Sequence, residues 1–250
     1  MHAGREFASE SEMTQTQLQS AGVVCWACGA EHAAGAPVCP TCNKVQQPVA
    51  GTDYFTALGL PRLLQIDVAA LEKQFYRLSR RLHPDLYATA GEEQQQWSTE
   101  QSSLLNDAYR TLKDPVERTR YLLQLEGASV EEESEKDRAA AKASGKAREQ
   151  KVPPDLLEEV FELNMQLEEL RMDSEDADLK QQLLVARNGF TAQLAACDDQ
   201  LRQLWQQWDA AWQSQDESGK SAAKDKLVAL LNRRNYIRNL VRDVNEALGE

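Results

Sequence analysis

The 250-residue sequence lacks a long hydrophobic run and contains little proline, glycine or positive charge. Because no apolar stretch approaches the roughly 18 residues that a membrane-spanning helix needs, we expect no membrane segment. The 8 Pro and 12 Gly lie among long stretches rich in Leu, Ala, Gln, Glu and Arg, which favours an all-α protein over a doubly wound or all-β fold. The 28 Lys and Arg against 40 Asp and Glu give a net charge of -12, which argues against a sequence-independent nucleic-acid binder held by phosphate contacts.

The N-terminal residues also lack the features of a targeting segment. They show no apolar core followed by a cleavage site, and they carry Glu6, Glu10 and Glu12 against the single Arg5, whereas a transit peptide is basic and poor in acids. We therefore expect a disordered tail over residues 1–22 in an intracellular protein, cytoplasmic if this N-terminus is complete. The cysteines of such a protein are expected to be reduced.

Four of the five cysteines are grouped in one short module, residues 23–47, with the spacing C-x2-C-x10-C-x2-C: Cys25, Cys28, Cys39 and Cys42. Two such pairs close a tetrahedral thiolate site of the kind that structural zinc prefers, and four ligands leave no open position for catalysis. We therefore predict one structural zinc ion. The spacing alone leaves open two independent redox pairs, unrelated core thiols, or iron in the same ligands.

The residues around these cysteines have simpler roles. Gly29 and Pro40 suit the tight turns that aim the sulfur atoms inward. His32 is not needed as a ligand, and we expect a solvated loop residue there. The remaining cysteine, Cys197, falls on an apolar helical stripe and is expected to be buried as a small hydrophobic residue.

Residues 52–126 are predicted to fold into helices. A helix over 67–82 is amphipathic, with Val68, Leu71, Phe75, Leu78 and Leu82 on its buried side. Its other side is basic and should attract an acidic partner surface through Lys73, Arg77, Arg80 and Arg81. Pro84 disfavours helix at His83, so the helix ends there and displays His83, Pro84 and Asp85 on a loop before a second helix at about 94–113.

The His-Pro-Asp tripeptide invites a catalytic interpretation that the rest of the sequence does not support. His83 and Asp85 flank a rigid proline, which turns neighbouring side chains apart, and no nucleophile or metal set accompanies them. We expect no enzymatic activity. The alternative for an isolated tripeptide is a proline-terminated helix with an incidental histidine.

Residues 127–152 mix Glu, Lys, Ala, Ser and Gly with almost no large apolar side chain, so we expect a flexible charged linker. Residues 153–250 then show three amphipathic stripes at helical spacing, which predict a three-helix bundle. The stripes are Leu156, Val160, Leu163, Leu167 and Leu170; then Phe190, Leu194, Cys197, Leu201, Leu204 and Trp208; then Leu227, Leu230, Ile237, Val241, Val244 and Leu248.

The first helix of this bundle carries a second apolar line. Leu157, Phe161 and Met165 follow each other at intervals of four residues, interleaved with Glu158, Glu162 and Glu169. An exposed apolar line with an acidic rim indicates a partner surface, although periodicity alone equally allows a wide stripe packed against both other helices. Tyr236, one step off the third stripe, fits either surface. We expect Trp205, Trp208 and Trp212 to pack in the core or at the end of the bundle.

The region around the tripeptide resembles the J domain. The resemblance rests on DYFTALGL at 53–60, the basic helix, HPD at 83–85 and LLNDAYRTLKDP at 104–115. It implies that His83, Pro84 and Asp85, with the four basic residues of the preceding helix, contact a heat-shock chaperone of the seventy-kilodalton class and stimulate its ATP hydrolysis. A J protein is a co-chaperone and not itself an enzyme.

The order of modules over about residues 23–250 resembles the HscB-type co-chaperones of iron-sulphur cluster assembly. In that family the C-terminal bundle holds the cluster scaffold protein, and LLEEVFELNMQLEEL at 156–170 is similar to the scaffold-binding helix. The resemblance implies scaffold contacts at Leu157, Phe161, Glu162, Met165, Glu169 and Tyr236. Two departures are a linker longer than is usual, and Glu158 and Met165 where an apolar and an acidic residue are expected.

The sequence therefore predicts a J domain at 52–126 and a scaffold-binding bundle at 153–250, preceded by a small zinc module. The four-cysteine module resembles the eukaryotic form of the family, which implies the mitochondrial matrix. The alternative functions are a general J-domain co-chaperone for other clients and a zinc-module adaptor for nucleic acid, which the acidic total disfavours. We expect no nucleic-acid and no membrane partner.

Overall fold

The computed structural model describes residues 22–130, 152–173 and 175–249, and these residues form two compact units. One unit comprises the described residues up to Arg62 together with Ile66–Asp114; the other comprises Leu63–Gln65 and the described residues from Pro115 onward. The tail expected at 1–22 and most of the linker expected at 127–152 lie outside the described residues. Among the described helices, none combines the length and apolar character needed to span a membrane.

The first unit begins with the cysteine module, which is built from tight turns and short extended segments. Strand β1 (Gly22–Val24) pairs antiparallel with β2 (Glu31–Ala33), with Val23 opposite His32. An isolated antiparallel bridge joins Val38 to Val45 across the second cysteine pair. The buried hydrophobic side chains of the module are Cys25, Val38, Cys39 and Val45, so burial of apolar area alone gives it little stability.

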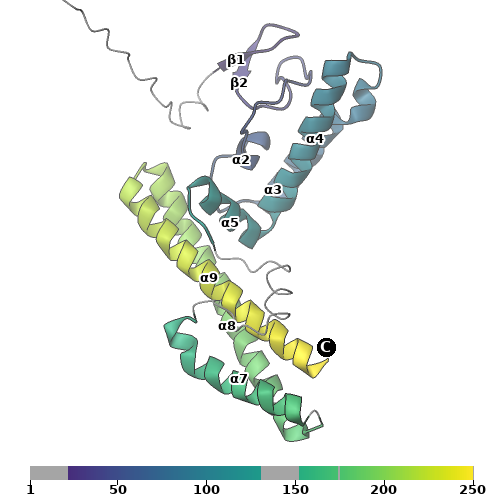
Figure 1. Cartoon of the computed structure of the whole chain (residues 1–250). Coiled ribbons are helices and arrows are strands. Elements are labelled where there is room, and N and C mark those ends of the chain that lie inside the picture. The colour runs from purple at the N-terminus through teal and green to yellow at the C-terminus, as the bar shows by residue number, and fades with distance from the viewer. Residues whose placement is uncertain (1–21, 131–151, 174, 250) are drawn as a thin grey trace, which may run out of the picture. The chain divides into compact units, whose positions relative to one another are not determined.

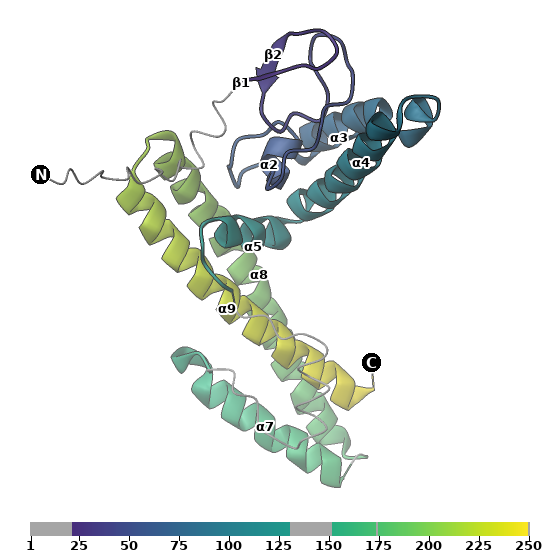
Figure 2. The ribbon, with the colours of Figure 1, turned by 45° about the horizontal axis from the view of Figure 1, so that its top comes forward.

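The helices of the first unit form a hairpin with a short helix beside it (Figures 1 and 2). They are α2 (Tyr54–Ala57), α3 (Val68–Leu82), the 3-10 helix η1 (Pro84–Tyr87) and α4 (Glu92–Lys113). Asp67 caps α3, because its carboxylate accepts hydrogen bonds from the backbone N–H groups of Ala69 and Ala70. Helix α3 ends at Leu82, immediately before His83-Pro84, as the restriction on residues preceding proline predicts.

The second unit contains the bundle. Its elements are α5 (Pro115–Leu125), the 3-10 helix η2 (Pro154–Leu156), α7 (Leu157–Met172), α8 (Ala177–Gln213) and α9 (Glu217–Leu248). Helices α8 and α9 lie side by side along most of their length, and α7 packs against them (Figures 1 and 2). Cys197 is buried, Trp205 and Trp208 are buried as well, and Trp212 stacks on Trp208. The predicted all-α class with a three-helix bundle is confirmed.

Buried polar contacts anchor the start of the second unit to α8. The Asp209 carboxylate accepts hydrogen bonds from the backbone N–H groups of Leu64 at 2.7 Å and Gln65 at 2.9 Å. The Trp205 indole donates to Thr119 Oγ1 of α5 at 2.9 Å. Burial raises the pKa of Asp209, while the two backbone donors act against that rise. Helix α5, expected within the J domain, is therefore held on the bundle by groups of α8.

Two apolar residues differ from their expected placement. Val68 was predicted on the buried side of α3, but as the first residue of that helix it is exposed. Tyr236 was assigned to a possible partner surface, but it lies buried within the bundle as part of the apolar core of α9. Periodicity locates a stripe to within about one residue, which is not enough to place side chains at its edges.

Candidate metal centre and binding surfaces

The four predicted cysteines converge on one point. Their sulfur atoms all lie within 4.8 Å of one another. Cys25 Sγ lies 3.6 Å from Cys42 Sγ, and Cys28 Sγ lies 3.8 Å from Cys39 Sγ, so each contact joins one cysteine of the first pair to one of the second. All four are free thiols rather than disulfides. The four sulfur atoms therefore form one cluster and not two separate pairs, which argues against two independent redox pairs.

Each cysteine pair is held by the same backbone turn. The carbonyl of Cys25 accepts from Gly29 N–H at 2.9 Å, and the carbonyl of Cys39 accepts from Asn43 N–H at 2.9 Å. Gly29 and Asn43 both adopt a left-handed backbone, with φ of 72° and 57°. Gly29 was expected to make the first turn. In the second turn the left-handed residue is Asn43, which tolerates that conformation, while Pro40 lies earlier in the turn.

Backbone and side-chain donors surround the Cys25 sulfur. Ala27 N–H and Gln46 Nε2 both donate to Cys25 Sγ at 3.4 Å. Burial alone raises the pKa of this thiol, but hydrogen bonds from Ala27, Cys28 and Cys42 outweigh burial and lower it to about 6. The pKa of Cys28 shifts the other way: against the backbone hydrogen bond from Ala30, which lowers it, burial and the side chains of the other three cysteines raise it.

The geometry fits a tetrahedral metal site. With zinc–sulfur bonds of about 2.3 Å, tetrahedral geometry sets the distance between sulfur atoms at about 3.8 Å. The distances of 3.6 Å between Cys25 Sγ and Cys42 Sγ and of 3.8 Å between Cys28 Sγ and Cys39 Sγ agree with that value without rearrangement of the turns. The four cysteines therefore can hold one metal ion, with no position left for a reacting water.

His32 is not the solvated loop residue that we expected. It lies buried on β2, and its Nε2 is 3.0 Å from Gln46 Oε1. His32 thereby orients the amide that donates to Cys25, so it supports a ligand without being one. Gln46 was missed by the sequence analysis, because a glutamine four residues beyond Cys42 carries no spacing signal.

The His-Pro-Asp tripeptide forms an exposed, ordered turn. His83 caps η1, and its Nδ1 lies 3.3 Å from the Asp85 backbone N–H, while its carbonyl accepts from Leu86 N–H at 2.9 Å. The side chains of His83 and Asp85 are 56% and 89% exposed. Local hydrogen bonds therefore fix the backbone of the turn while both side chains stay exposed. The expectation that the proline turns these side chains apart is wrong, since His83 Nδ1 lies 3.4 Å from Asp85 Oδ2.

Buried groups that the sequence analysis missed support this turn from below. Ser98 Oγ and Ser102 Oγ of α4 donate to the carbonyl of Leu82, at 2.6 and 3.0 Å. The Tyr87 hydroxyl donates to the Arg81 carbonyl at 3.0 Å. These bonds satisfy the last carbonyls of α3, which would otherwise lack partners because Pro84 interrupts the helix.

The basic residues of α3 share one face. Together with Tyr76 they line a shallow hollow of about 470 Å³: Lys73, Arg77, Arg80 and Arg81. The first three are exposed and Arg81 is half-buried. Glu72, the acidic residue of this stretch, accepts a hydrogen bond from Tyr109 of α4 at 3.2 Å and is half-buried. This face therefore presents positive charge next to the turn.

The second apolar line of α7 is exposed. Leu157, Phe161 and Met165 are 55%, 68% and 59% exposed, whereas Val160 and Leu163 are buried. The interpretation of a wide stripe packed into the bundle is therefore wrong. Glu158, Glu162 and Glu169 are exposed as well and border these three residues, which we call the α7 patch. Tyr236 is not part of it.

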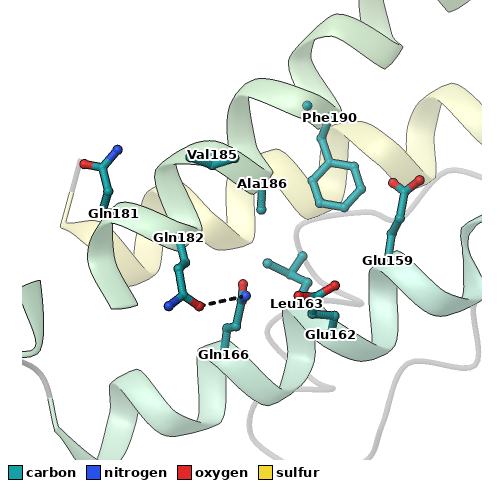
Figure 3. A pocket seen from close by; sticks show the side chains of 10 residues that line it. Glu159, Glu162, Leu163, Gln166, Gln181, Gln182, Val185, Ala186 and Phe190 are labelled. Atoms are coloured by element: carbon teal, nitrogen blue, oxygen red, sulfur yellow. Dashed lines mark hydrogen bonds between the residues drawn. The ribbon is translucent and has the colours of Figure 1, made fainter. Parts of the chain in front are cut away.

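A groove lies between α7 and α8, on the flank of α7 next to the acidic rim. Its volume is about 510 Å³, and its apolar lining includes Leu163, Phe190 and Val185 (Figure 3). Gln166 Nε2 donates to Gln182 Oε1 at 3.3 Å across the two helices (Figure 3). Glu162 belongs to both the groove and the rim of the α7 patch, so the two features adjoin.

Comparisons with known proteins find J-domain proteins, in agreement with the His-Pro-Asp turn and the basic helix beside it. A family model described as the DnaJ domain matches residues 53–121. The chain is 27% identical over 179 residues to the Iron-sulfur cluster co-chaperone protein HscB of Mus musculus and 28% identical over 179 residues to that of Homo sapiens, with 70% of each chain covered. The crystal structure of human co-chaperone protein HscB shares its fold, with a TM-score of 0.52, 22% identity, and coverage of 90% of this chain and 98% of that one.

An ordered His-Pro-Asp turn beside a basic helix, within a matched DnaJ domain, makes this a J-domain protein. The appended bundle and the similarity to relatives over 70% of the chain agree with one group of J-domain proteins. The chain is similar to the HscB-type J-domain co-chaperones over that length.

Proposed function

We propose that the protein binds an iron-sulphur cluster scaffold protein and delivers it to a heat-shock chaperone of the seventy-kilodalton class, whose ATP hydrolysis it stimulates. The observation that carries this proposal is that one chain exposes two separate surfaces of different chemistry. One is the His-Pro-Asp turn with the basic face of α3, and the other is the acid-rimmed α7 patch.

The J-domain surface supports the chaperone half of the proposal. His83, Pro84 and Asp85 are exposed on an ordered turn, and Lys73, Arg77, Arg80 and Arg81 lie along the helix that leads to it. Positive charge at this position speeds the encounter with an acidic surface. Relatives that match 70% of this chain are named co-chaperones, a class without enzymatic activity of its own.

The α7 patch supports the scaffold half. Exposed apolar side chains bordered by charge are uncommon on a surface that has no partner. Phe161, flanked by Leu157 and Met165, supplies an aromatic anchor, while Glu162 and Glu169 supply a polar rim. Binding scaffold and chaperone through one chain raises their effective concentration for each other, so ATP hydrolysis is coupled to a delivered scaffold.

The metal in the four-cysteine centre is, in this proposal, a structural zinc ion. The four-thiolate set and the sulfur spacing suit zinc, and a full ligand set leaves the metal without a catalytic role. Metal analysis of the purified protein is expected to give about one zinc per chain. A finding of iron, or of no metal in a folded module, would contradict this assignment.

A ternary complex tests the proposed function. The full chain is mixed with scaffold alone, with chaperone and ATP alone, and with both, and the species are separated by analytical ultracentrifugation. A single species that contains all three proteins is expected. Two binary species that exclude each other would overturn delivery, and chaperone binding without scaffold binding would leave a general J-domain co-chaperone.

A further inference from the structure

The side chain of Gln46 reaches one of the four convergent sulfur atoms. Gln46 is buried, and its Nε2 donates to Cys25 Sγ at 3.4 Å. The same nitrogen lies 2.9 Å from the Lys44 carbonyl and 3.1 Å from the Val45 carbonyl. Because all three of these neighbours are acceptors, the amide is oriented with its nitrogen, and not its oxygen, toward the sulfur. Gln46 therefore supports a ligand of the proposed metal centre through an N–H donor.

His32 fixes the other end of that amide. Its Nε2 lies 3.0 Å from Gln46 Oε1, and its Nδ1 lies 3.0 Å from the Ala33 carbonyl, so the buried ring is held from two sides. An amide oxygen can only accept, so His32 Nε2 carries the proton of the hydrogen bond to Gln46. A chain of two hydrogen bonds thus runs from His32 through Gln46 to the sulfur of Cys25.

The backbone of Gln46 is held on both sides as well. Its N–H donates to the Pro37 carbonyl at 3.0 Å, and its carbonyl accepts from Nε2 of the buried Gln101 of α4 at 3.4 Å. With both backbone groups and both ends of the amide bonded, the side chain has little freedom to turn away from Cys25. The donor is therefore in place before a metal binds, and its ordering costs nothing at that moment.

The four sulfur ligands differ in their access to solvent. Cys25 and Cys39 are buried, whereas Cys28 is exposed and Cys42 is half-buried. A competing ligand in solution therefore meets the centre from the side of Cys28. All the metal–sulfur bonds must break before the metal leaves, so the hold on the buried Cys25 limits how fast the centre can be emptied.

We propose that Gln46, oriented by His32, is a positioning residue that locks the Cys25 thiolate onto the metal and thereby slows loss of metal from the four-cysteine centre. Four thiolates outweigh the charge of a divalent ion, and an N–H donor to sulfur withdraws part of the excess negative charge, which lowers the repulsion among the ligands. The lock rests on the proposed metal centre and does not depend on the chaperone or the scaffold.

Matched substitutions at two neighbouring positions test the lock. Gln46→Glu keeps the size of the side chain and replaces its N–H donor by an acceptor, while Gln47→Glu makes the same chemical change on the exposed neighbour. The full-length wild type and both variants are loaded with one equivalent of zinc and mixed with an excess of a chromogenic chelator. Zinc should leave Gln46→Glu roughly tenfold faster than the wild type, as loss of an outer partner of a ligand predicts. Gln47→Glu should release zinc at the wild-type rate.

Cobalt(II) in place of zinc separates a lock on the sulfur from a general loosening of the module. Without the N–H donor the Cys25 sulfur is richer in electrons, so the sulfur-to-cobalt charge-transfer band of Gln46→Glu should move to longer wavelength. The band of Gln47→Glu should not move. Release from Gln46→Glu at the wild-type rate, or faster release with an unmoved band, would overturn the proposal. A wild type that binds neither ion would refute the metal centre itself.

His32→Phe carries the test if Gln46→Glu does not fold. Phenylalanine keeps a ring in the buried site and removes the nitrogen that holds Gln46 Oε1. Release of zinc should be faster than from the wild type, and the double variant should lose zinc no faster than Gln46→Glu alone, because His32 acts through Gln46. A wild-type release rate for His32→Phe, or additive effects of the two substitutions, would contradict the proposed orientation of Gln46 by His32.

Discussion

The exposed face of α3 and the exposed face of α7 differ in both charge and polarity. The α3 face carries four cations with the phenol of Tyr76 among them, and it leads to a turn whose His and Asp side chains are open. The α7 face carries Leu157, Phe161 and Met165 with three carboxylates around them. The first surface is built for steering and for one specific polar contact, and the second for burial of apolar area.

In the proposed function, the opposite charges that border the two surfaces direct each partner to its own surface, because each surface repels a partner suited to the other. The net charge of -12 does not reveal these opposite local charges, since the basic face is confined to one helix. The two surfaces should therefore respond differently to substitution and to salt.

The largest expected effect comes from His83→Gln, which changes the turn and leaves the α7 patch intact. Stimulation of the chaperone should fall by roughly thirtyfold or more, the equivalent of about 2 kcal/mol, as expected for a central contact residue. Single-turnover hydrolysis with the variant measures it. Thermal unfolding and scaffold affinity are the controls and should not change; stimulation at the wild-type level would remove the turn from the mechanism.

The second largest effect is expected from a substitution in the α7 patch. Phe161→Ala should weaken scaffold binding by at least about 1 kcal/mol, or roughly fivefold in Kd, because an exposed aromatic anchor is truncated. Calorimetric titration of scaffold measures it. Met172→Ala is the matched control, since Met172 is exposed at the end of the same helix and lies outside the α7 patch. Equal affinities for both variants would show that the patch does not bind scaffold.

The smallest expected effect comes from a change in ionic strength and needs no substitution. Raising ionic strength from about 0.05 M to about 0.5 M should increase the half-saturating concentration for chaperone stimulation about threefold, because salt screens exposed charges. Scaffold binding should change by a smaller factor, since buried apolar area contributes most of it. Parallel titrations of the two activities test this, and equal salt slopes would contradict the assigned difference between the surfaces.

Sequence patterns predicted those features that depend on residues close together in the chain. The C-x2-C-x10-C-x2-C spacing predicted a convergent centre, and Pro84 predicted the end of α3 at its observed position. The stripes of Leu and Val predicted the bundle, because helical periodicity and burial are linked. The second apolar line within 156–170 also predicted Phe161 as a candidate contact, but only the structure shows that this residue is exposed.

Contacts between distant segments were beyond such patterns. Ser98 and Asp209 form hydrogen bonds with backbone groups 16 and 145 residues away in the chain, and Gln46 donates to the sulfur of Cys25, 21 residues away. Nothing in the neighbouring sequence marks these partners. Buried polar groups need such partners, but many arrangements satisfy them equally well. For the same reason His32 was misplaced, since its burial depends on Gln46.

In the proposed function, one chain couples scaffold binding to chaperone ATP hydrolysis. The most direct test is single-turnover ATP hydrolysis by the cognate chaperone, measured with and without this protein and with scaffold added to each. We expect the protein alone to stimulate hydrolysis, and we expect a further increase when scaffold is present. Stimulation that is indifferent to scaffold, or no stimulation of an active chaperone, would contradict it.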